Sequence, residues 1–491
     1  MTTTLKVALL GAGTVGAEVA RILRQDHEVL QEKTGAALEL SHVVVRNTEA
    51  DRGPWIDRGI ISDDASAAIA DADLVIELMG GIEPAKTYIV EALSAGKDVV
   101  TGNKALIAES GAELNALARK KGAQLFYEAA VAGAIPILRS IYESLAGDNI
   151  TSVMGIVNGS TNYILDKMDR EGASLEAVME EASAFGYLEA DPSADVDGHD
   201  AAAKAAILAT YAFGTPYTID EVYTEGIRSV TAADVKAAQE NNQVIKLLAI
   251  VNKTETGVSM RVHPALISRE HPLAAVHEAF NAVFVEAENA GQLMFYGAGA
   301  GGAPTASAVM GDVVTAVRQR INGTALQPFT LPEGLPALTI DETVTRYTIG
   351  IEVEDTTGVL AQIAQTFAQH GVSIESMKQE SLAATDTANS GDPRALLRLI
   401  THAAQESGFT ATVEDLKKLD VVRGISSVLR VEGGKPKWLT SGAGSSANTL
   451  TVYRSVKTIA LSRSEKAAHR WCMRRPYRKR RAMTSTSRLR A

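Results

Sequence analysis

The chain has 491 residues, of which 46% are hydrophobic and 22% are charged, values typical of globular proteins that exclude wholesale disorder. The length predicts about three domains. A single cysteine, Cys472, excludes a disulfide scaffold and a cysteine-rich zinc site. No apolar run is long enough to cross a membrane, and a strand pattern that begins at Leu5 leaves no room for a signal peptide. We therefore expect a soluble, cytoplasmic protein.

The net charge of −11 is unevenly distributed along the chain. Residues 435–491 hold 15 of the 48 Lys and Arg residues but one of the 59 acidic residues, so residues 1–434 have a net charge of −25. Such an acidic body is a poor candidate for nucleic-acid binding. The basic tail, which includes RRPYRKRR at 474–481, is interpreted as disordered rather than as a nucleic-acid-binding arm. Its abrupt composition also fits an out-of-frame or read-through end.

The first 130 residues alternate strand and helix patterns. A helical spacing of apolar residues covers 15–30, and short apolar strands are predicted at 5–10, 40–45, 74–79, 98–101 and 124–128. This alternation predicts βαβ units and a parallel sheet covered on both faces, the Rossmann-type arrangement. We place this α/β domain at 1–135.

The middle of the chain, 136–330, has a less regular pattern. Helices are predicted at 135–145, 175–185 and 199–213, and strands at 150–157 and 258–262. Two glycine-rich stretches lie at 155–160 and 297–302. We interpret this part as a mixed α/β substrate domain.

Residues 331–346 contain Pro332, Gly334 and Pro336, a composition typical of a linker. The pattern that follows, up to 433, is βαββαβ, which predicts a ferredoxin-like module. Its strands are expected at 347–353, 372–380, 395–403 and 426–431, with helices at 358–370 and 412–419 and an exposed hairpin loop at 383–394.

The first βα junction carries a dinucleotide-binding fingerprint, Gly11-Ala12-Gly13-Thr14-Val15-Gly16. Its glycines allow a tight turn, close approach of the pyrophosphate, and close packing of helix on sheet. An NAD site usually has an acidic residue at the end of the second strand. Here that position is Arg46, which would pair with a 2′-phosphate. We therefore predict NADP, with NAD as the alternative.

Two lysines are candidates for the chemistry. Lys104 follows the strand at 98–101, and ligands bind beyond the carboxyl ends of strands in open α/β sheets. Lys204 lies four residues after Asp200 on a helix that is otherwise apolar, so the two side chains share a face. A surface ion pair is the alternative interpretation. A lone lysine on a buried helix, however, needs an acidic partner and favours a functional role.

Two enzyme classes are disfavoured by what the sequence lacks. Cys472 lies in the basic tail, outside every predicted folded unit, which argues against a thiolate nucleophile that oxidises an aldehyde to an acyl product. No histidine pair has the spacing of a catalytic zinc site. Simple hydride transfer between an alcohol and an aldehyde remains.

These motifs together resemble homoserine dehydrogenase of the bacterial monofunctional type, with a C-terminal ACT domain. The resemblance runs from about Leu5 to Glu432, and its most specific stretch is GYLEADPSADVDGHDAAAK at 186–204. It also includes GNK at 102–104, EAAVAGAI at 128–135, GIVNGSTNY at 155–163 and YGAGAGGAPT at 296–305.

The resemblance implies NAD(P)H-dependent interconversion of L-aspartate 4-semialdehyde and L-homoserine, on the route to threonine, methionine and isoleucine. It implies that Lys204 protonates the carbonyl oxygen, that Lys104 is the second lysine of the site, and that Asp200 orients Lys204. It further implies that Glu189 holds the substrate ammonium, that residues 296–325 pack back near the cofactor through Gly302, and that the amino-acid pocket is lined by Gly159, Ser160, Tyr187 and Asp195.

The resemblance also implies a regulatory apparatus and a monovalent cation, most plausibly Na⁺. The expected cation ligands are backbone carbonyls near Glu128, namely those of Val131, Gly133 and Ile135. The ACT module at 347–433 implies feedback control by L-threonine at its first strand–helix turn, Asp355 to Gly358. ACT sheets commonly pair, so a homodimer or tetramer is expected.

Two other functions stay open at this point. One is a different NADP-dependent reductase of a small amino-acid aldehyde or keto acid, which the segment 189–204 argues against. The other is a non-catalytic sensor that joins a dinucleotide-binding domain to an ACT module. It would bind cofactor without turnover, and the presence of both Lys104 and Lys204 counts against it.

Overall fold

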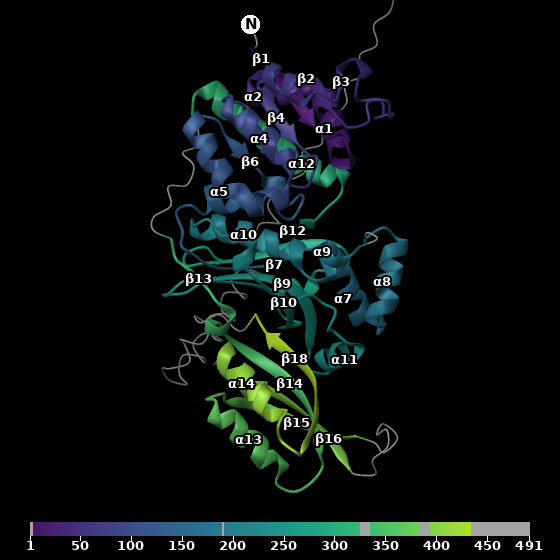
Figure 1. Ribbon diagram of the computed structural model, residues 1–491, viewed down its shortest axis with the longest axis vertical. Coiled ribbons are helices and arrows are strands. Elements are labelled where there is room, and N and C mark those ends of the chain that lie inside the picture. Colours follow the sequence, from purple (N-terminus) through teal and green to yellow (C-terminus); the bar gives the residue numbers. More distant parts are fainter. Residues whose placement is uncertain (1–2, 189–190, 325–333, 383–392, 434–491) are drawn as a thin grey trace, which may run out of the picture. The chain divides into compact units, whose positions relative to one another are not determined.

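The amino-terminal part is an α/β layer built on a parallel sheet, as the alternating pattern predicts (Figure 1). The computed structural model describes residues 3–188, 191–324, 334–382 and 393–433. The sheet has the order β3-β2-β1-β4-β5-β6, and every pairing is parallel. Its strands are β1 (Thr3–Leu10), β2 (Ala36–Val44), β3 (Ile61–Ser62), β4 (Leu74–Glu77), β5 (Asp98–Thr101) and β6 (Leu125–Phe126).

The sheet is covered by helices that bury apolar side chains against it. These helices are α1 (Thr14–Gln25), α2 (His27–Thr34), α3 (Ala65–Asp71), α4 (Ala85–Ser94) and α5 (Lys104–Lys121), together with α12 (Gly302–Asn322) from much later in the chain. The later helix packs on α1.

The single helix predicted at 15–30 is in fact two. Asp26 has φ −104° and ψ 21° and ends α1 while it precedes α2, because aspartate is a poor helix former whose side chain competes for backbone hydrogen bonds. The helix predicted at 135–145 begins only at Ile137. Pro136 disfavours helical backbone at the residue before it, and α6 (Ile137–Arg139) continues as a π-helical turn, Ser140–Ser144.

The middle of the chain forms one end of a second, mixed sheet of order β12-β11-β7-β9-β10-β18-β14-β16-β15. The strands from this region are β7 (Ile150–Ile156), β8 (Tyr223–Thr224), β9 (Gln243–Lys253), β10 (Val258–Ser268), β11 (Phe280–Ala287) and β12 (Gly291–Ala298). Helix α10 (His199–Phe213), predicted with the same bounds, packs on β9 and β10. The other helices are α7 (Gly159–Glu171), α8 (Leu175–Ala184), α9 (Ser193–Val196) and α11 (Ala232–Glu240).

The carboxyl-terminal part has the predicted βαββαβ order and contributes the other end of this sheet. Strand β18 joins the two ends, because it pairs with β14 on one side and with β10 on the other. The elements are β14 (Val344–Glu354), α13 (Val359–Gln369), β15 (Ile374–Leu382), β16 (Arg394–Thr401), β17 (Ala404–Gln405), α14 (Glu406–Leu416) and β18 (Val422–Val431). Most of the hairpin loop expected at 383–394 and the whole basic tail lie outside the described residues.

Among the residues that the structure describes, no helix combines the length and apolar character needed to cross a membrane.

Candidate active site

Two lysines and one aspartate meet where α5 and α10 begin. Lys104 is the first residue of α5, and Asn103 caps that helix by accepting from the Leu106 amide. Gly198, in the left-handed conformation with φ +87°, precedes α10 and so aims its first turn, which carries Asp200. The Asp200 carboxylate lies 2.6 Å from the Lys204 Nζ through Oδ2 and 2.6 Å from the Lys104 Nζ through Oδ1.

The burial of this cluster is unequal. Asp200 and Lys204 are each 7% exposed, while the Lys104 side chain is 48% exposed. The Lys204 Nζ also donates a 2.6 Å hydrogen bond to the Val157 carbonyl at the end of β7. The predicted ion pair between Asp200 and Lys204 is therefore a buried one, joined by a second, more accessible ammonium group from the amino-terminal domain.

The environment shifts the pKa values of both buried groups. Burial lowers the pKa of Lys204, although the neighbouring Asp200 carboxylate acts in the opposite direction. For Asp200, burial by itself would raise the pKa, but the charges of Lys204 and Lys104 outweigh it and hold that pKa far below its usual range. The aspartate stays ionised, and the lysine is closer to releasing its proton than a solvated lysine would be.

Asn158 is a member of this cluster that was not predicted as a site residue. Its Nδ2 donates to Asp200 Oδ2 at 2.9 Å and to Asp195 Oδ1 at 2.6 Å, while its Oδ1 accepts from the Thr161 amide and caps α7. The sequence signal was available, because an asparagine three residues before a threonine at a strand–helix junction is typical of a cap. Asn158 thereby links Asp195 and Asp200.

The other predicted pocket residues lie around α7 and α9. The Ser160 hydroxyl donates to the Tyr187 carbonyl at 2.8 Å, and the Tyr187 ring packs on Tyr163 with centroids 4.8 Å apart. Gly159 packs so closely on the Ala279 carbonyl that a Cβ would lie 2.7 Å from its oxygen. Glu189, predicted to hold the substrate ammonium, lies outside the described residues.

The dinucleotide fingerprint has the backbone that its glycines predict. Gly11 has φ +97°, and a Cβ on Gly16 would lie 2.2 Å from the Gly11 carbonyl oxygen, whereas a Cβ on Gly13 would meet nothing within 4 Å. Gly302 is the first residue of α12, where a Cβ would lie 3.1 Å from the Thr14 side chain. The space above Gly13 is the open side that a pyrophosphate requires.

Two arginines lie near this fingerprint. Arg46, predicted to pair with a 2′-phosphate, is exposed just after β2. Arg52 was not predicted: its guanidinium donates to the Ala12 carbonyl at 3.2 Å and to the Asn47 carbonyl at 3.1 Å. It fixes the glycine loop to the segment that follows β2.

The loop predicted to hold a cation packs on the glycine-rich loop before α12. Ala132 and Gly133 both have positive φ, the Ala134 amide donates to the Ala298 carbonyl, and a Cβ on Gly133 would lie 2.5 Å from Gly299. The carbonyls of Val131 and Gly133 accept no hydrogen bond from any residue that the structure describes, whereas the Ile135 carbonyl already accepts from Ile137. Free carbonyls of this kind suit a hard cation.

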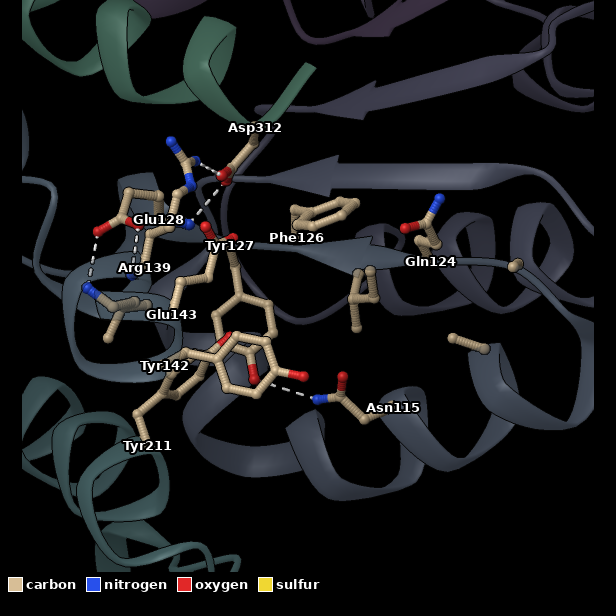
Figure 2. A pocket seen from close by; sticks show the side chains of 14 residues that line it. Asn115, Gln124, Phe126, Tyr127, Glu128, Arg139, Tyr142, Glu143, Tyr211 and Asp312 are labelled. Atoms are coloured by element: carbon tan, nitrogen blue, oxygen red, sulfur yellow. Dashed lines mark hydrogen bonds and ion pairs between the residues drawn. The ribbon is translucent and has the colours of Figure 1, made fainter. Parts of the chain in front are cut away.

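The Glu128 side chain is buried and bonds to the backbone that follows this loop. Its carboxylate accepts from the amides of Leu138 and Arg139, each at 2.8 Å, and its own amide donates to the buried Asp312 carboxylate, which pairs with Arg139 (Figure 2). Burial raises the pKa of Glu128, and burial raises that of Asp312 to about 7. This network supports the loop beside a cavity of about 90 Å³.

Among the described residues, no group of three or more His, Cys, Asp and Glu side chains could hold a metal ion. The loop with Val131, Gly133 and Ile135 is of a different type, because its candidate ligands are backbone carbonyls rather than side chains.

Comparisons with known proteins agree with this geometry. Three family models match the chain: the NAD-binding domain of homoserine dehydrogenase at 11–128, homoserine dehydrogenase at 136–314, and the ACT domain at 347–421. A homoserine dehydrogenase from Corynebacterium glutamicum is 48% identical over 433 residues, which cover 87% of this chain and 95% of that protein.

Solved structures give the same result. A homoserine dehydrogenase from Thiobacillus denitrificans superposes with a TM-score of 0.81 at 36% identity, covering 88% of this chain and 98% of that one. A hyperthermophilic archaeal homoserine dehydrogenase solved in complex with NADPH has a TM-score of 0.56 at 30% identity, covering 64% of this chain and 98% of that one. The chain therefore belongs to the homoserine dehydrogenase family of oxidoreductases, with a nicotinamide-dinucleotide-binding domain and an ACT domain.

Proposed function

We propose that Lys204, Asp200 and Lys104 carry the reaction that interconverts L-aspartate 4-semialdehyde and L-homoserine. The observation that supports this is the carboxylate held between two ammonium groups, one buried and one accessible, where the two domains meet. One carboxylate between two ammonium groups leaves one net positive charge among these three groups. Negative charge that develops on a substrate oxygen there is stabilised.

The nicotinamide, when bound, supplies or accepts the hydride at the substrate carbon. In the reducing direction the aldehyde oxygen becomes an alkoxide, and Lys204 transfers a proton from Nζ to that oxygen. In the oxidising direction, neutral Lys204 accepts the hydroxyl proton of homoserine. The pKa of Lys204, lowered by burial, makes both directions accessible. Asp200 holds the amine in place, and Lys104 adds positive charge on the side open to solvent.

The amino-acid end of the substrate is proposed to lie against Gly159, Ser160, Tyr187 and Asp195, with Glu189 as partner of its ammonium group. Support comes from Asp195, which Asn158 ties to the Asp200 carboxylate. A carboxylate for the ammonium would distinguish amino-acid aldehydes from plain aldehydes.

NADP is proposed as the preferred cofactor. The fingerprint Gly11, Ala12, Gly13, Thr14, Val15 and Gly16 would hold the pyrophosphate, with Gly302 closing the site from α12. No acidic side chain ends β2, and the exposed Arg46 offers a guanidinium to a 2′-phosphate. Arg46→Ala should lower kcat/KM with NADP⁺ and leave kcat/KM with NAD⁺ nearly unchanged. Equal losses with both would contradict this preference.

A monovalent cation, proposed to be Na⁺, would bind the carbonyls of Val131, Gly133 and Ile135. The support is the unengaged carbonyls of Val131 and Gly133 in a loop that packs directly on Gly299. Replacing Na⁺ by tetramethylammonium at constant ionic strength should lower activity, and adding Na⁺ should restore it. Equal activity in both salts would contradict the site.

Feedback control by L-threonine is proposed for the ACT domain. A hollow of about 520 Å³ lies at its first strand–helix turn, where Asp355 accepts from the Gln379 amide group. L-threonine should inhibit the wild type, and Asp355→Ala should relieve that inhibition with unchanged basal turnover. The role in threonine, methionine and isoleucine synthesis, the homo-oligomeric state and the cytoplasmic location stay predictions.

The reaction is tested by following NADPH at 340 nm with L-homoserine and NADP⁺. Lys204→Ala should lower kcat by about 100-fold or more, the usual contribution of a general acid–base group. Lys121→Ala, which removes an exposed lysine at the far end of α5, is the control and should retain activity. A folded Lys204→Ala variant with wild-type kcat would overturn the role, and a wild type that binds NADPH without turnover would favour the sensor.

A further inference from the structure

A buried ionic cluster joins the carboxyl-terminal domain to the middle domain, far along the chain from the reacting groups. Arg430 on β18 is 9% exposed. Its Nε donates to Glu406 Oε2 at 3.0 Å and its Nη2 donates to Glu406 Oε1 at 2.7 Å, so the guanidinium is fixed by α14. The Tyr347 hydroxyl donates to the same carboxylate at 2.6 Å. This side of Arg430 therefore belongs to the ACT domain.

The other side of Arg430 reaches the middle domain. Its Nη1 donates to Glu225 Oε2 at 2.9 Å, and its guanidinium carbon lies 5.0 Å from the centre of the Tyr223 ring. The backbone supports this contact, because β18 pairs in parallel with β10 at Ala265 and Arg430, and β10 pairs in parallel with β8. Arg430 thus bridges carboxylates of two domains.

Glu225 lies directly beside the turn from which α10 begins. The next residue, Gly226, packs so closely on this turn that a Cβ would lie 2.2 Å from the Val196 carbonyl oxygen and 2.5 Å from the Asp197 Cα. The Ile227 amide donates to that same carbonyl at 2.8 Å. A shift of the backbone at Glu225 and Gly226 would therefore move this turn as well, because two backbones are in contact there.

The turn in question sets the direction of Asp200. Gly198, which precedes α10, would place a Cβ 3.1 Å from the Thr224 side chain and 3.6 Å from the Glu225 carbonyl oxygen. Asp200 lies two residues later, in the first turn of the helix, and Lys204 one turn further. The start of α10 therefore packs against the segment 223–227.

We infer that Arg430 and Glu225 are positioning residues of the reaction: the guanidinium from the ACT domain holds Glu225, which seats the Val196–Gly198 turn and so orients Asp200 between Lys204 and Lys104. The inference rests on the proposed role of Asp200 and Lys204. It gives a continuous physical route from α14 and β18 to the reacting groups. An altered ACT domain would act on turnover along this route, with little effect on the distant fingerprint glycines.

The test compares Glu225→Gln with Glu354→Gln in the full chain, using L-homoserine oxidation. Glu354 is a matched control, because it also pairs with an arginine, Arg423, and its side chain is 29% exposed against 32% for Glu225, but it lies wholly within the ACT domain. Glu225→Gln should lower kcat about five- to tenfold, in the usual range of coupling between sites. The KM for NADP⁺ should stay within about twofold, and Glu354→Gln should match the wild type.

A double-mutant cycle with Arg430→Met separates positioning from general destabilisation. If Arg430 acts through Glu225, the double variant should have about the same kcat as the Arg430→Met variant, because the second change removes nothing further. Should Arg430→Met fail to fold, the isosteric Glu225→Gln comparison decides by itself. Wild-type kcat in Glu225→Gln overturns the inference, whereas an active Lys204→Ala variant would instead overturn the proposed function.

Discussion

At the scale of single residues, Asp200 and Lys204 control each other's protonation. Burial lowers the pKa of Lys204, while the Asp200 carboxylate opposes that effect. Asp200→Asn removes the opposing charge, so the pKa of Lys204 should fall further. In the proposed mechanism homoserine oxidation needs the neutral amine, so the rising limb of kcat/KM against pH should move to lower pH. The maximal rate should fall because the amine loses its orienting partner.

The measurement is a pH profile of kcat/KM from pH 6 to pH 10 for both proteins. Asp220→Asn, an exposed carboxylate outside the cluster, is the control and should reproduce the wild-type limb. A limb that stays in place in Asp200→Asn would mean that the titrating group is not Lys204.

A second buried lysine, Lys246 on β9, should make stability depend on pH. Its side chain is fully buried, its Nζ donates to Asn162 and to the Val276 carbonyl, and Asp166 lies 4.0 Å away. Burial lowers the pKa of Lys246 to about 8, although Asp166 and Asp169 act against it. Between about pH 8 and the unfolded value of 10.5, the unfolded chain binds one more proton than the folded protein.

Stability of the wild type relative to Lys246→Met should therefore rise with pH through this window, by on the order of 3 kcal/mol. Denaturant unfolding at pH 7.5 and pH 10 measures the difference. Below pH 8 the charged amine is present in both the folded and the unfolded state. The difference in the free energy of unfolding between wild type and Lys246→Met should therefore not change with pH there. A stability difference that stays constant up to pH 10 would show that Lys246 keeps its positive charge in the folded protein.

The pairing of Asp200 with Lys204 could be predicted because its signal is local. Asp200 and Lys204 are one helical turn apart on an apolar helix, and a charge there requires a partner whatever the rest of the fold. The contact of Lys104 with Asp200 could be placed only through family resemblance, since the two residues are 96 positions apart in the sequence and no periodicity joins them. The role of Asn158 was hidden for the same reason: its cap is a local pattern, but its bond to Asp200 is tertiary.

At the scale of elements, Gly16 and Gly13 should have different functions in the first strand–helix turn. Gly16→Ala would place a methyl group 2.2 Å from the Gly11 carbonyl oxygen, so the turn itself should be distorted and the melting temperature should fall. Gly13→Ala meets no protein atom within 4 Å. It should preserve the melting temperature but raise the KM for NADP⁺ about tenfold, because the methyl group enters the space of the pyrophosphate.

Thermal unfolding and cofactor titration on the two variants check this contrast. Gly35→Ala, outside the fingerprint, is not a suitable control because Gly35 also has a positive φ of +78°. Gly147, which has open space around it and no positive φ, provides a better one. An unchanged KM in Gly13→Ala would argue against a pyrophosphate at this turn.

Elements with a clear period were predicted well, and those without one were not. Helix α10 has its predicted bounds, and β1, β5 and β7 lie within a residue or two of theirs. Strand β9 was missed because its buried run from Val244 to Val251 is covered on both faces, which removes the alternation that identifies a strand. The π-helical turn after α6 was not predicted, and its contact with Tyr211 through Tyr142 joins residues that are distant in the sequence.

At the scale of the whole molecule, the domains are joined by a continuous sheet and by buried charges rather than by a simple tether. Strand β18 lies between β10 and β14, so two domains that are distant in the sequence share one sheet. The βαββαβ order of the ACT domain was predictable, but this pairing was not, because a parallel contact of two residues leaves no pattern in either segment. The ACT domain is therefore part of the support of the catalytic domain.

The strength of that junction can be measured at Arg261 and Glu432. Arg261 on β10 is 2% exposed, and its Nη2 lies 2.8 Å from Glu432 Oε1, which also accepts from Thr345. Glu432→Leu leaves a buried guanidinium without its carboxylate, which typically costs about 3–5 kcal/mol. The double variant Arg261→Met/Glu432→Leu replaces both charges by apolar groups and should recover most of that loss, since the desolvation penalty disappears with the charges. Denaturant unfolding of the two variants decides between these outcomes. If the single variant is as stable as the wild type, the pair contributes little to the junction, and the β10–β18 ladder with Arg430 must hold the domains together.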